Sequence, residues 1–175
     1  NARKLPWRKK NTLNLPDPYF VFVSEYMLQQ TTVNTVKNKF NDFILKWPSL
    51  NKLAQTSEPN ILKFWSGLGY YSRARNLLKS AKIIKKNFKN NIPKTYDELI
   101  QLPGIGDYTA KAILGIGYNK SVMPLDANIE RILVRLHAID KPINKVKNKL
   151  KDLGKKFISD KYSSNLIQSF MDYGS

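Results

Sequence analysis

The chain has no cysteine and a single histidine, His137, among its 175 residues. It can therefore form no disulfide and no thiolate metal site of its own, and one imidazole leaves almost nothing for a zinc site. No run approaches the ~20 apolar residues of a membrane span, and the stretch from Asn1 to Trp7 has no apolar signal-peptide core. We expect His137 to be structural and the protein to be intracellular, not secreted.

Acidic residues are also scarce. Only 13 Asp and Glu stand against 30 Lys and Arg, which gives a formal net charge of +17, and the basic residues are spread along the chain instead of forming a tail. A genome bias toward Lys, Asn and Ile explains part of this excess, but it does not explain why acids are so few. The charge therefore indicates a polyanionic partner.

Apolar residues recur at helical spacing, and no period-two strand pattern persists. Asp17 predicts an N-cap for a buried helix that begins at Pro18 or Tyr19. Further helices are expected over 33–47, 50–54, 58–65, 71–88, 108–116, 145–157 and 164–171, with N-caps at Ser49 and Ser57, a capping box from Thr95 to Glu98, and Asp126 capping one more. The sequence thus predicts an all-α fold, as one domain or as two small lobes sharing a core.

The stretch from Leu102 to Ala110, LPGIGDYTA, predicts a tight turn between two helices. Gly104 and Gly106 bracket Ile105, and the amide groups of such a turn and of the next helix can hold a phosphate. The following helix ends shortly before Asp126, so an anion-binding turn and a carboxylate should become neighbours. Taken alone, the motif fits an ordinary helical corner followed by an Asp N-cap equally well.

Glu25 is the anomaly of the first long helix. Its neighbours three and four positions away are Val21, Phe22, Leu28 and Gln29, so its carboxyl lies largely among apolar side chains and its pKa should be raised. An acid of that kind can donate a proton near neutral pH. The alternative is a glutamate near a helix end that reaches solvent or caps a backbone group.

The stretch from Gly67 to Asn76, GLGYYSRARN, places two glycines, two tyrosines and two arginines at the start of a helix. Such a surface can stack on bases and contact phosphates through Arg73 and Arg75. The alternative is that Tyr70 and Tyr71 are half-buried packing residues.

Together with SEYMLQQT at 24–31 and LDAN at 125–128, these segments resemble the MutY adenine DNA glycosylases in content, order and spacing. The resemblance covers essentially the whole chain and extends to the helix-hairpin-helix glycosylase superfamily, whose turn would be residues 104–106. The other segments are far more specific than the turn. The resemblance implies two helical lobes, residues 15–121 and residues 1–14 with 122–175, and a DNA-binding cleft between them.

The resemblance also implies a reaction: adenine mispaired with 8-oxoguanine or guanine is flipped out and removed by hydrolysis of its N-glycosidic bond. Glu25 would protonate adenine N7, and Asp126 would stabilise the oxocarbenium-like sugar or attack it. Asn128 would orient Asp126. Tyr108 would assist the intermediate at a position where related endonuclease III enzymes carry a lysine. Because a phenol cannot form a Schiff base, a pure glycosylase is favoured over a combined glycosylase and lyase.

Further residues carry over to the DNA and the base. Trp7 and Arg8 match the entry to the adenine pocket, while Gln30 and Tyr70 match residues that wedge into the duplex around the opposite base. Other DNA contacts are expected from Leu28, Arg73, Gly104, Ile105 and Gly106. The implied partner is double-stranded DNA with an A:8-oxoguanine or A:G pair, bound by a monomer in the cytoplasm, at the bacterial nucleoid.

Two departures from the family concern the region after residues 171–175. Family members usually continue into four cysteines that bind a [4Fe-4S] cluster and then into a domain that reads 8-oxoguanine. Neither is in these residues, so the cluster expected for the family cannot be bound by them, and a fragment and a lost cluster both remain open. The rival functions are a non-catalytic DNA-binding module and a bifunctional lyase, which would need Lys111 or another lysine beside the sugar.

Overall fold

The computed structural model describes residues 3–158 and 161–175, and within these ranges it contains no strand, only an isolated backbone bridge between Lys10 and Pro16. The elements are a 3-10 turn η1 (Pro6–Arg8) and helices α1 (Pro18–Leu28), α2 (Val33–Lys46), α3 (Leu50–Ala54), α4 (Glu58–Trp65), α5 (Ser72–Asn87), α6 (Tyr96–Ile100), α7 (Asp107–Ala112), a π-helical turn η2 (Ile113–Gly117), α8 (Ala127–Leu136), α9 (Ile143–Lys155) and α10 (Ser163–Tyr173). The predicted all-α fold is confirmed. Residues 1, 2, 159 and 160 of the predicted second lobe lie outside the described residues.

Polar side chains cap the first turns of α1, α2, α3, α6 and α8. The carboxylate of Asp17 accepts a hydrogen bond from the amide of Tyr19 at 2.8 Å and caps α1 as predicted. The Thr95 hydroxyl accepts from the Glu98 amide and donates to its carboxylate at 2.6 Å, so the predicted pair caps α6. Ser57 occupies the cap position of α4, but its side chain makes no capping bond, and this expectation is wrong in that respect.

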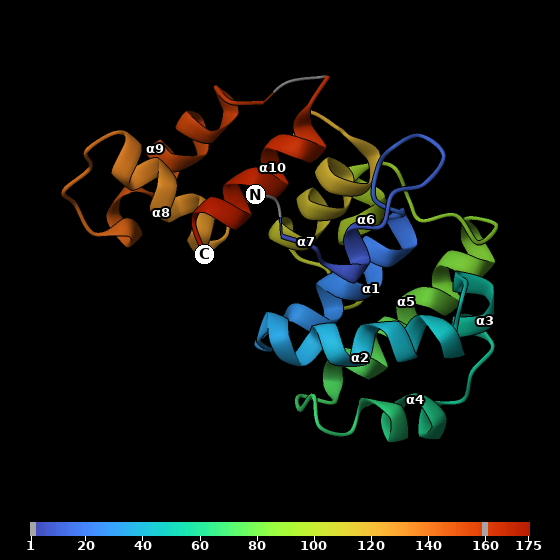
Figure 1. Cartoon of the computed structure of the whole chain (residues 1–175). Helices are drawn as coiled ribbons and strands as arrows, with labels where there is room; N and C mark the ends of the chain where they lie inside the picture. The colour runs from blue at the N-terminus through green and yellow to red at the C-terminus, as the bar shows by residue number, and fades with distance from the viewer. Residues whose placement is uncertain (1–2, 159–160) are drawn as a thin grey trace.

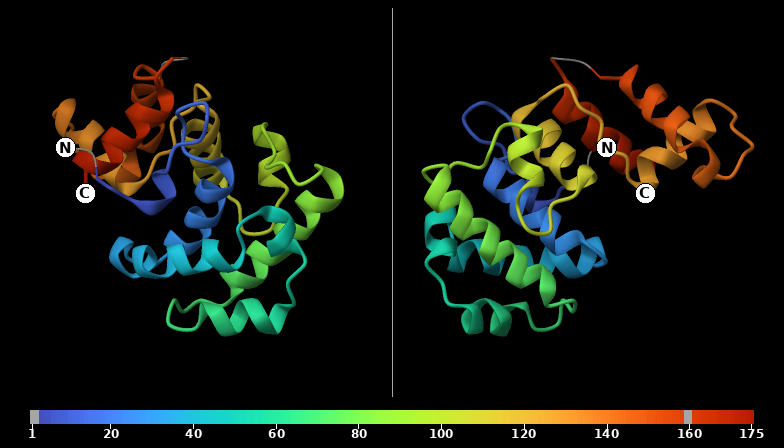
Figure 2. Two further views of the ribbon diagram at one scale, coloured as in Figure 1. Left: turned by 45° about the vertical axis from the view of Figure 1, so that its right-hand side comes forward. Right: turned by 180° about the vertical axis from the view of Figure 1, so that it is seen from behind.

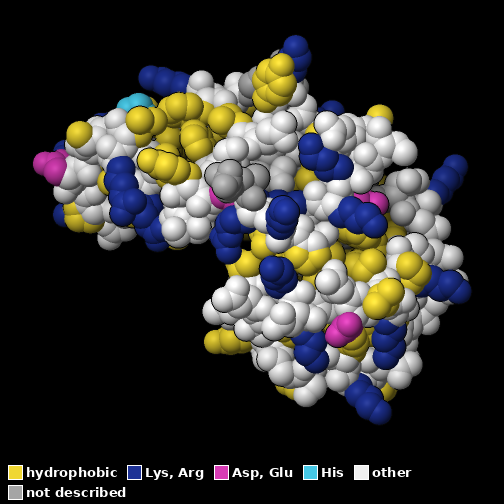
Figure 3. Space-filling model, in the orientation of Figure 1, with side chains coloured by type: hydrophobic (Ala, Val, Ile, Leu, Met, Phe, Trp, Pro, Cys, Tyr) yellow, Lys and Arg dark blue, Asp and Glu magenta, His cyan; other side chains and the backbone are white. Residues whose placement is uncertain are grey.

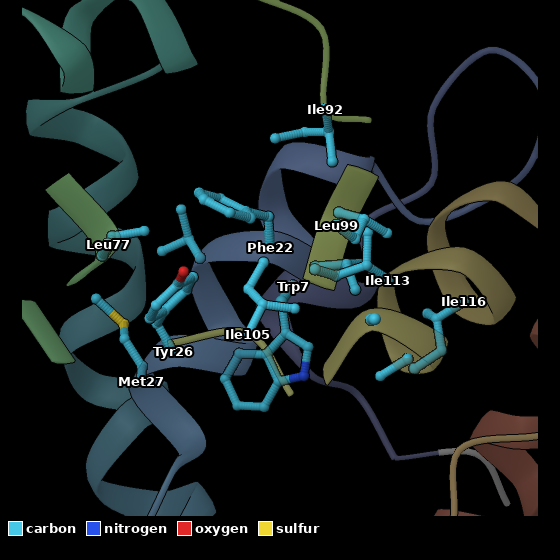
Figure 4. Close-up of a cluster of buried hydrophobic side chains, with 14 of the residues drawn as sticks. Trp7, Phe22, Tyr26, Met27, Leu77, Ile92, Leu99, Ile105, Ile113 and Ile116 are labelled. Atoms are coloured by element: carbon cyan, nitrogen blue, oxygen red, sulfur yellow. The ribbon is translucent and has the colours of Figure 1, made fainter. Parts of the chain in front are cut away.

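Helix α1 is the centre of the core. Every residue from Val21 to Met27 is buried, and the helix contacts α2, α5, α7 and η2. Phe22 and Tyr26 of α1 lie among apolar side chains from α5, α6 and η2, including Leu77 and Ile113 (Figure 4). Burial of each large apolar side chain stabilises the fold by roughly 1.5–3 kcal/mol. Packing on several sides therefore fixes where Glu25 lies.

Helices α8, α9 and α10 stand together at one end of the molecule (Figures 1 and 2). Helix α10 joins this group to the rest by packing on η2, where a Cβ on Gly115 would lie 2.3 Å from the Ile167 side chain. The N-terminal segment reaches the same helix, because the amide of Arg3 donates to Asp172 at 2.9 Å. The absence of a side chain at Gly115 therefore lets α10 approach η2 closely. The lobe boundaries at 14/15 and 121/122 stay a prediction.

The helix predicted over 108–116 is irregular. Helix α7 ends at Ala112 and widens into the π-helical turn η2, which ends at Gly117. A Cβ on Gly117 would lie 3.1 Å from the backbone of Pro18, so the small residue lets η2 meet the start of α1. Turns of this kind often occur at functional sites. This one brings Ile116 to the wall of the cavity described next.

Candidate active site

A cavity of about 410 Å³ lies where η1, α1, α7, η2, α8 and α10 meet, a volume typical of small-molecule sites. Its walls include predicted site residues from all along the chain: Trp7, Arg8, Glu25, Leu28, Tyr108, Asp126 and Asn128. They also include residues that the sequence analysis did not single out, among them Ser24, Gln168, Met171 and Asp172. The fold thus gathers acid, phenol, amide and aromatic groups around one space.

Glu25 is buried, with 6% of its surface exposed. Burial raises the pKa of its carboxyl to about 8, and the negative charge of Asp126 acts in the same direction, while a hydrogen bond from Tyr108 acts against both. The raised pKa predicted from the apolar neighbours of Glu25 is confirmed. The alternative of a glutamate that reaches solvent is wrong, because α1 is covered at this point.

Tyr108 lies in the first turn of α7, and its hydroxyl donates a hydrogen bond to the Glu25 carboxyl. Burial raises the pKa of this phenol well above its ordinary value, and the charges of Glu25 and Asp126 raise it further. Tyr108 therefore stays protonated throughout the physiological range and acts here as a hydrogen-bond donor.

Asp126 is the N-cap of α8, as the sequence predicts. One carboxylate oxygen accepts from the amide of Ile129 at 2.8 Å, and the other accepts from the side-chain amide of Asn128 at 3.1 Å. The positive end of the α8 dipole favours negative charge at this position. Asn128 is held in turn by Arg131, which donates to its side-chain oxygen at 3.3 Å and also to the carbonyl of Gly174. The carboxylate thus has a fixed orientation at the cavity wall.

Trp7 and Arg8 bring the N-terminal segment to the cavity. Trp7 is buried and packs edge-on against Phe40, with ring centroids 5.5 Å apart. Arg8 makes a forked pair with Asp172 of α10, with both nitrogen–oxygen distances at 2.7 Å. Burial acts to raise the pKa of Asp172, but hydrogen bonds from Arg8 and from the Arg3 amide outweigh it, and the pKa lies below its ordinary value. Sequence reasoning missed Asp172 because its partner lies far away in the chain.

Hydrogen bonds from side chains of α1 and α5 hold the predicted hairpin turn in place. The carbonyl of Pro103 accepts hydrogen bonds from the hydroxyls of Tyr26 and Ser80, at 2.5 and 3.0 Å. Gly104 has φ +81° and its carbonyl accepts from the Gln29 side chain at 3.1 Å. Within the turn, Gly104 and Gly106 are exposed. Ile105 between them is only 6% exposed, and its buried side chain anchors the turn in the core.

The expected wedge residues lie outside the cavity. Gln30 follows α1 and Tyr70 precedes α5, and both side chains are exposed. Both residues have left-handed backbone, with φ 55° and 45°. Leu28, two residues before Gln30, is half-buried and lines the cavity. The roles of Gln30 and Tyr70 as wedge residues and of Leu28 as a DNA contact stay predictions.

Arg73 corrects a prediction. The sequence places it at the start of α5 beside two tyrosines, which suggested a phosphate contact. Only 5% of its surface is exposed, and its guanidinium donates to backbone carbonyls of the two neighbouring loops. The guanidinium is buried and both of its terminal nitrogens donate to acceptors within the protein, so Arg73 is not a surface cation.

Metal-ligating side chains do not gather at the cavity or elsewhere among the described residues. No group of three or more His, Cys, Asp or Glu among the described residues could hold a metal ion, and the chain has no cysteine. The residues present therefore do not fit a [4Fe-4S] cluster, which needs cysteine thiolates. Within residues 3–158 and 161–175, none of the helices combines the length and the apolar character that a membrane span requires.

Comparison with known proteins assigns the fold to a family. Residues 23–156 match the family described as HhH-GPD superfamily base excision DNA repair protein. The chain belongs to this superfamily. The turn at residues 104–106 joins α6 to α7 and lies within the matched region. The family match confirms the predicted helix-hairpin-helix assignment.

Two similar sequences carry the name adenine DNA glycosylase. An adenine DNA glycosylase of Buchnera aphidicola subsp. Acyrthosiphon pisum is 42% identical over 177 residues, which cover 99% of this chain and 49% of the relative. The human adenine DNA glycosylase is 37% identical over 178 residues, covering 98% of this chain and 33% of the relative. The chain thus spans half or less of the length of these curated relatives.

Solved HhH-GPD structures show the same fold. A thermostable thymine-DNA glycosylase superposes with a TM-score of 0.84 at 23% identity, covering 99% of this chain and 78% of that one. A non-covalent endonuclease III–DNA complex gives 0.77 at 18% identity, covering 99% and 77%. At these identities the likeness establishes the fold, and the predicted endonuclease III-like architecture is confirmed.

Proposed function

We propose that this HhH-GPD chain is the glycosylase part of an adenine DNA glycosylase, which removes adenine paired with 8-oxoguanine or guanine in double-stranded DNA. The names of its curated relatives, adenine DNA glycosylase, support adenine as the base that is removed. The observation that carries the proposal is that Glu25, buried with a pKa raised to about 8, shares one small cavity with Asp126. Glycosidic cleavage uses two such carboxyl groups, one protonated and one ionised.

In the proposed reaction the flipped adenosine occupies the cavity. Glu25 gives its proton to adenine N7, the bond between C1′ and the base breaks, and the electron pair leaves with the base. Asp126, fixed by Asn128 and by the start of α8, stabilises the cationic sugar or adds to it. Water then supplies the hydroxyl at C1′ and returns a proton to a carboxylate. Tyr108 keeps Glu25 in place by its hydrogen bond.

A bifunctional lyase is less well supported. It needs a lysine beside the sugar, and no lysine is among the described residues that line the cavity. Lys111, the candidate from the sequence, instead contacts the Asp107 carboxylate at 2.8 Å on the exposed side of α7. A purely DNA-binding module would leave a buried acid in a cavity without a role. Both observations favour a monofunctional hydrolase.

In the proposed complex the DNA lies on the exposed hairpin turn. Gln30 and Tyr70 enter the duplex, and Trp7 and Arg8 lie at the adenine pocket. The backbone amides at Gly106 and the start of α7 suit a phosphate, since they lie at a helix N-terminus. We further propose that the DNA binds in a cleft between two lobes, that the active form is a monomer, and that the enzyme acts on DNA in the bacterial nucleoid.

Single-turnover excision of adenine from an A:8-oxoguanine duplex tests the proposal. Glu25→Gln keeps the shape of the side chain but cannot deliver a proton, so excision should fall by at least the ~100-fold typical of lost general-acid catalysis, with duplex binding retained. The wild-type rate should fall as pH rises through about 8, because Glu25 then loses its proton. Asp126→Asn should be at least as damaging.

The control is Glu130→Gln, the same chemical change on α8 at a residue outside the cavity lining. It should excise at the wild-type rate. Near wild-type excision by Glu25→Gln and Asp126→Asn together would refute the catalytic assignment and leave the binding module.

A further inference from the structure

The two loops that carry Gln30 and Tyr70 share an unusual backbone. Both residues have positive φ, 55° and 45°, although neither is a glycine. Left-handed backbone at residues with a Cβ costs free energy, so the surrounding structure must hold it. Gly67 and Gly69 beside Tyr70 are also left-handed, at φ 89° and 68°. Neither loop is a regular element, and neither would keep its shape unaided.

Arg73 connects these two loops. One of its terminal nitrogens donates to carbonyls at the end of α1, and the other donates both to the Thr31 hydroxyl and to the loop before α5. The acceptors are the carbonyls of Tyr26 at 3.2 Å, Met27 at 2.7 Å and Gln29, then the Thr31 hydroxyl at 2.9 Å and the carbonyls of Leu68 at 2.8 Å and Gly69 at 3.1 Å. A single side chain thus holds both segments from inside.

The charge suits this position without a carboxylate partner. The last carbonyls of α1 have no intrahelical donors and carry the negative end of the helix dipole. The guanidinium also lies 5.6 Å from the Trp65 ring centroid and 5.7 Å from that of Tyr70, within cation–π range. The Nε atom of Arg73 has no partner, so the two terminal nitrogens make all these bonds. Lysine, with one nitrogen, cannot span both loops in this way.

We propose that Arg73 is a positioning residue that clamps the loops 28–31 and 67–70 into one unit and so aims Gln30 and Tyr70 at the duplex. The inference rests on the proposed function, because it gives those two side chains their target. Arg73 touches neither base nor sugar. Its loss should impair the parting of a base pair more than the chemistry in the cavity, since it does not line that cavity.

The excision test compares Arg73→Lys with Arg135→Lys, the same change in the last turn of α8, where the side chain is exposed and lies outside the cavity lining. Two duplexes are used, one with adenine opposite 8-oxoguanine and one with adenine opposite an abasic site, where no base pair has to be opened. Arg73→Lys should slow excision from the paired duplex at least about tenfold more than from the unpaired adenine. Arg135→Lys should change neither rate. Equal slowing on both duplexes, or none, would overturn the proposal.

Amide hydrogen exchange without DNA supplies a second measurement. Arg73→Lys should speed exchange at residues 28–31 and 67–70 and leave the centre of α1 protected, whereas unchanged exchange in both loops would overturn the clamp. If Arg73→Lys does not fold, Thr31→Val, which removes one of the acceptors, should show both effects to a smaller degree, and their absence would count against the clamp equally. A wild type that excises adenine from neither duplex refutes the proposed function, while the exchange result still decides the clamp.

Discussion

The buried carboxyl of Glu25 couples folding to pH. Its pKa of about 8 in the folded chain compares with an ordinary value of 4.5. Between these values the folded state keeps a proton that the unfolded state has lost, so the free energy of unfolding falls as pH rises, by roughly 1.4 kcal/mol per unit. Glu25→Gln has no such proton. We predict that this variant is more stable than the wild type at pH 8 and that its advantage shrinks toward pH 5.

Denaturant unfolding of both proteins at pH 5, 6.5 and 8 measures the difference. Glu130→Gln should follow the wild type at every pH, since that residue lies outside the cavity lining. Parallel stability curves for the wild type and Glu25→Gln would show that the carboxyl ionises normally and would remove its claim to act as an acid at neutral pH.

Residues were predictable from the sequence where a local pattern marks them. Glu25 stands out because its helix neighbours are apolar, and Asp126 because it precedes a helix. Asp172 has no such signal, because its partner Arg8 is 164 positions away. Arg73 was misread for a related reason: an arginine among tyrosines looks like a phosphate contact, and only the tertiary structure reveals that backbone carbonyls from distant segments bury it.

The two glycines of the hairpin have different tasks, which substitution can separate. Gly104 has φ +81°, and a Cβ there would lie 3.0 Å from both Asn76 and Tyr26. Gly106 has extended backbone and nothing within 4 Å of such a Cβ. We predict that Gly104→Ala lowers the free energy of unfolding by at least about 1 kcal/mol, whereas Gly106→Ala changes it by less than about 0.5 kcal/mol. Thermal unfolding measures both.

The open space at Gly106 is where the proposed phosphate would approach. Gly106→Asp should therefore fold but bind DNA more weakly whatever base stands opposite adenine, because its carboxylate repels phosphate. Fluorescence anisotropy on mispaired and fully paired duplexes measures this affinity. If affinity is intact, the turn is only a corner of the fold.

The helices themselves followed from periodicity and caps, and their ends moved where no cap exists. Helix α9 spans 143–155 instead of 145–157, and α10 spans 163–173 instead of 164–171. In neither helix does a side chain cap the first turn, so packing sets the boundary. The π-helical turn η2 was not predicted, since it depends on the contacts of Gly115 and Gly117 with distant elements.

The whole molecule presents a strongly basic surface. Lys and Arg side chains are distributed over the face shown in Figure 3, with few Asp or Glu among them. A wide hollow of about 1340 Å³ shares part of its wall with the candidate active site, and its cations are Arg3, Lys4, Arg8, Lys9, Lys10 and Lys37. The sequence supplied the sign and size of the charge. It could not say that cations from the N-terminal segment and from α2 meet beside the cavity, because that meeting depends on the fold.

This charge leads to the last prediction, which concerns salt. Each phosphate neutralised by the chain releases condensed counterions, so log K for duplex DNA should fall with log salt at a slope of about −0.9 per phosphate. With on the order of six contacts, affinity should fall by roughly a thousandfold between 50 and 200 mM salt. Lys79→Gln and Lys82→Gln, on the exposed face of α5 away from both hollows, should leave the slope nearly unchanged. Anisotropy titrations across this range measure it, and an affinity that does not depend on salt would contradict the proposed nucleic-acid partner.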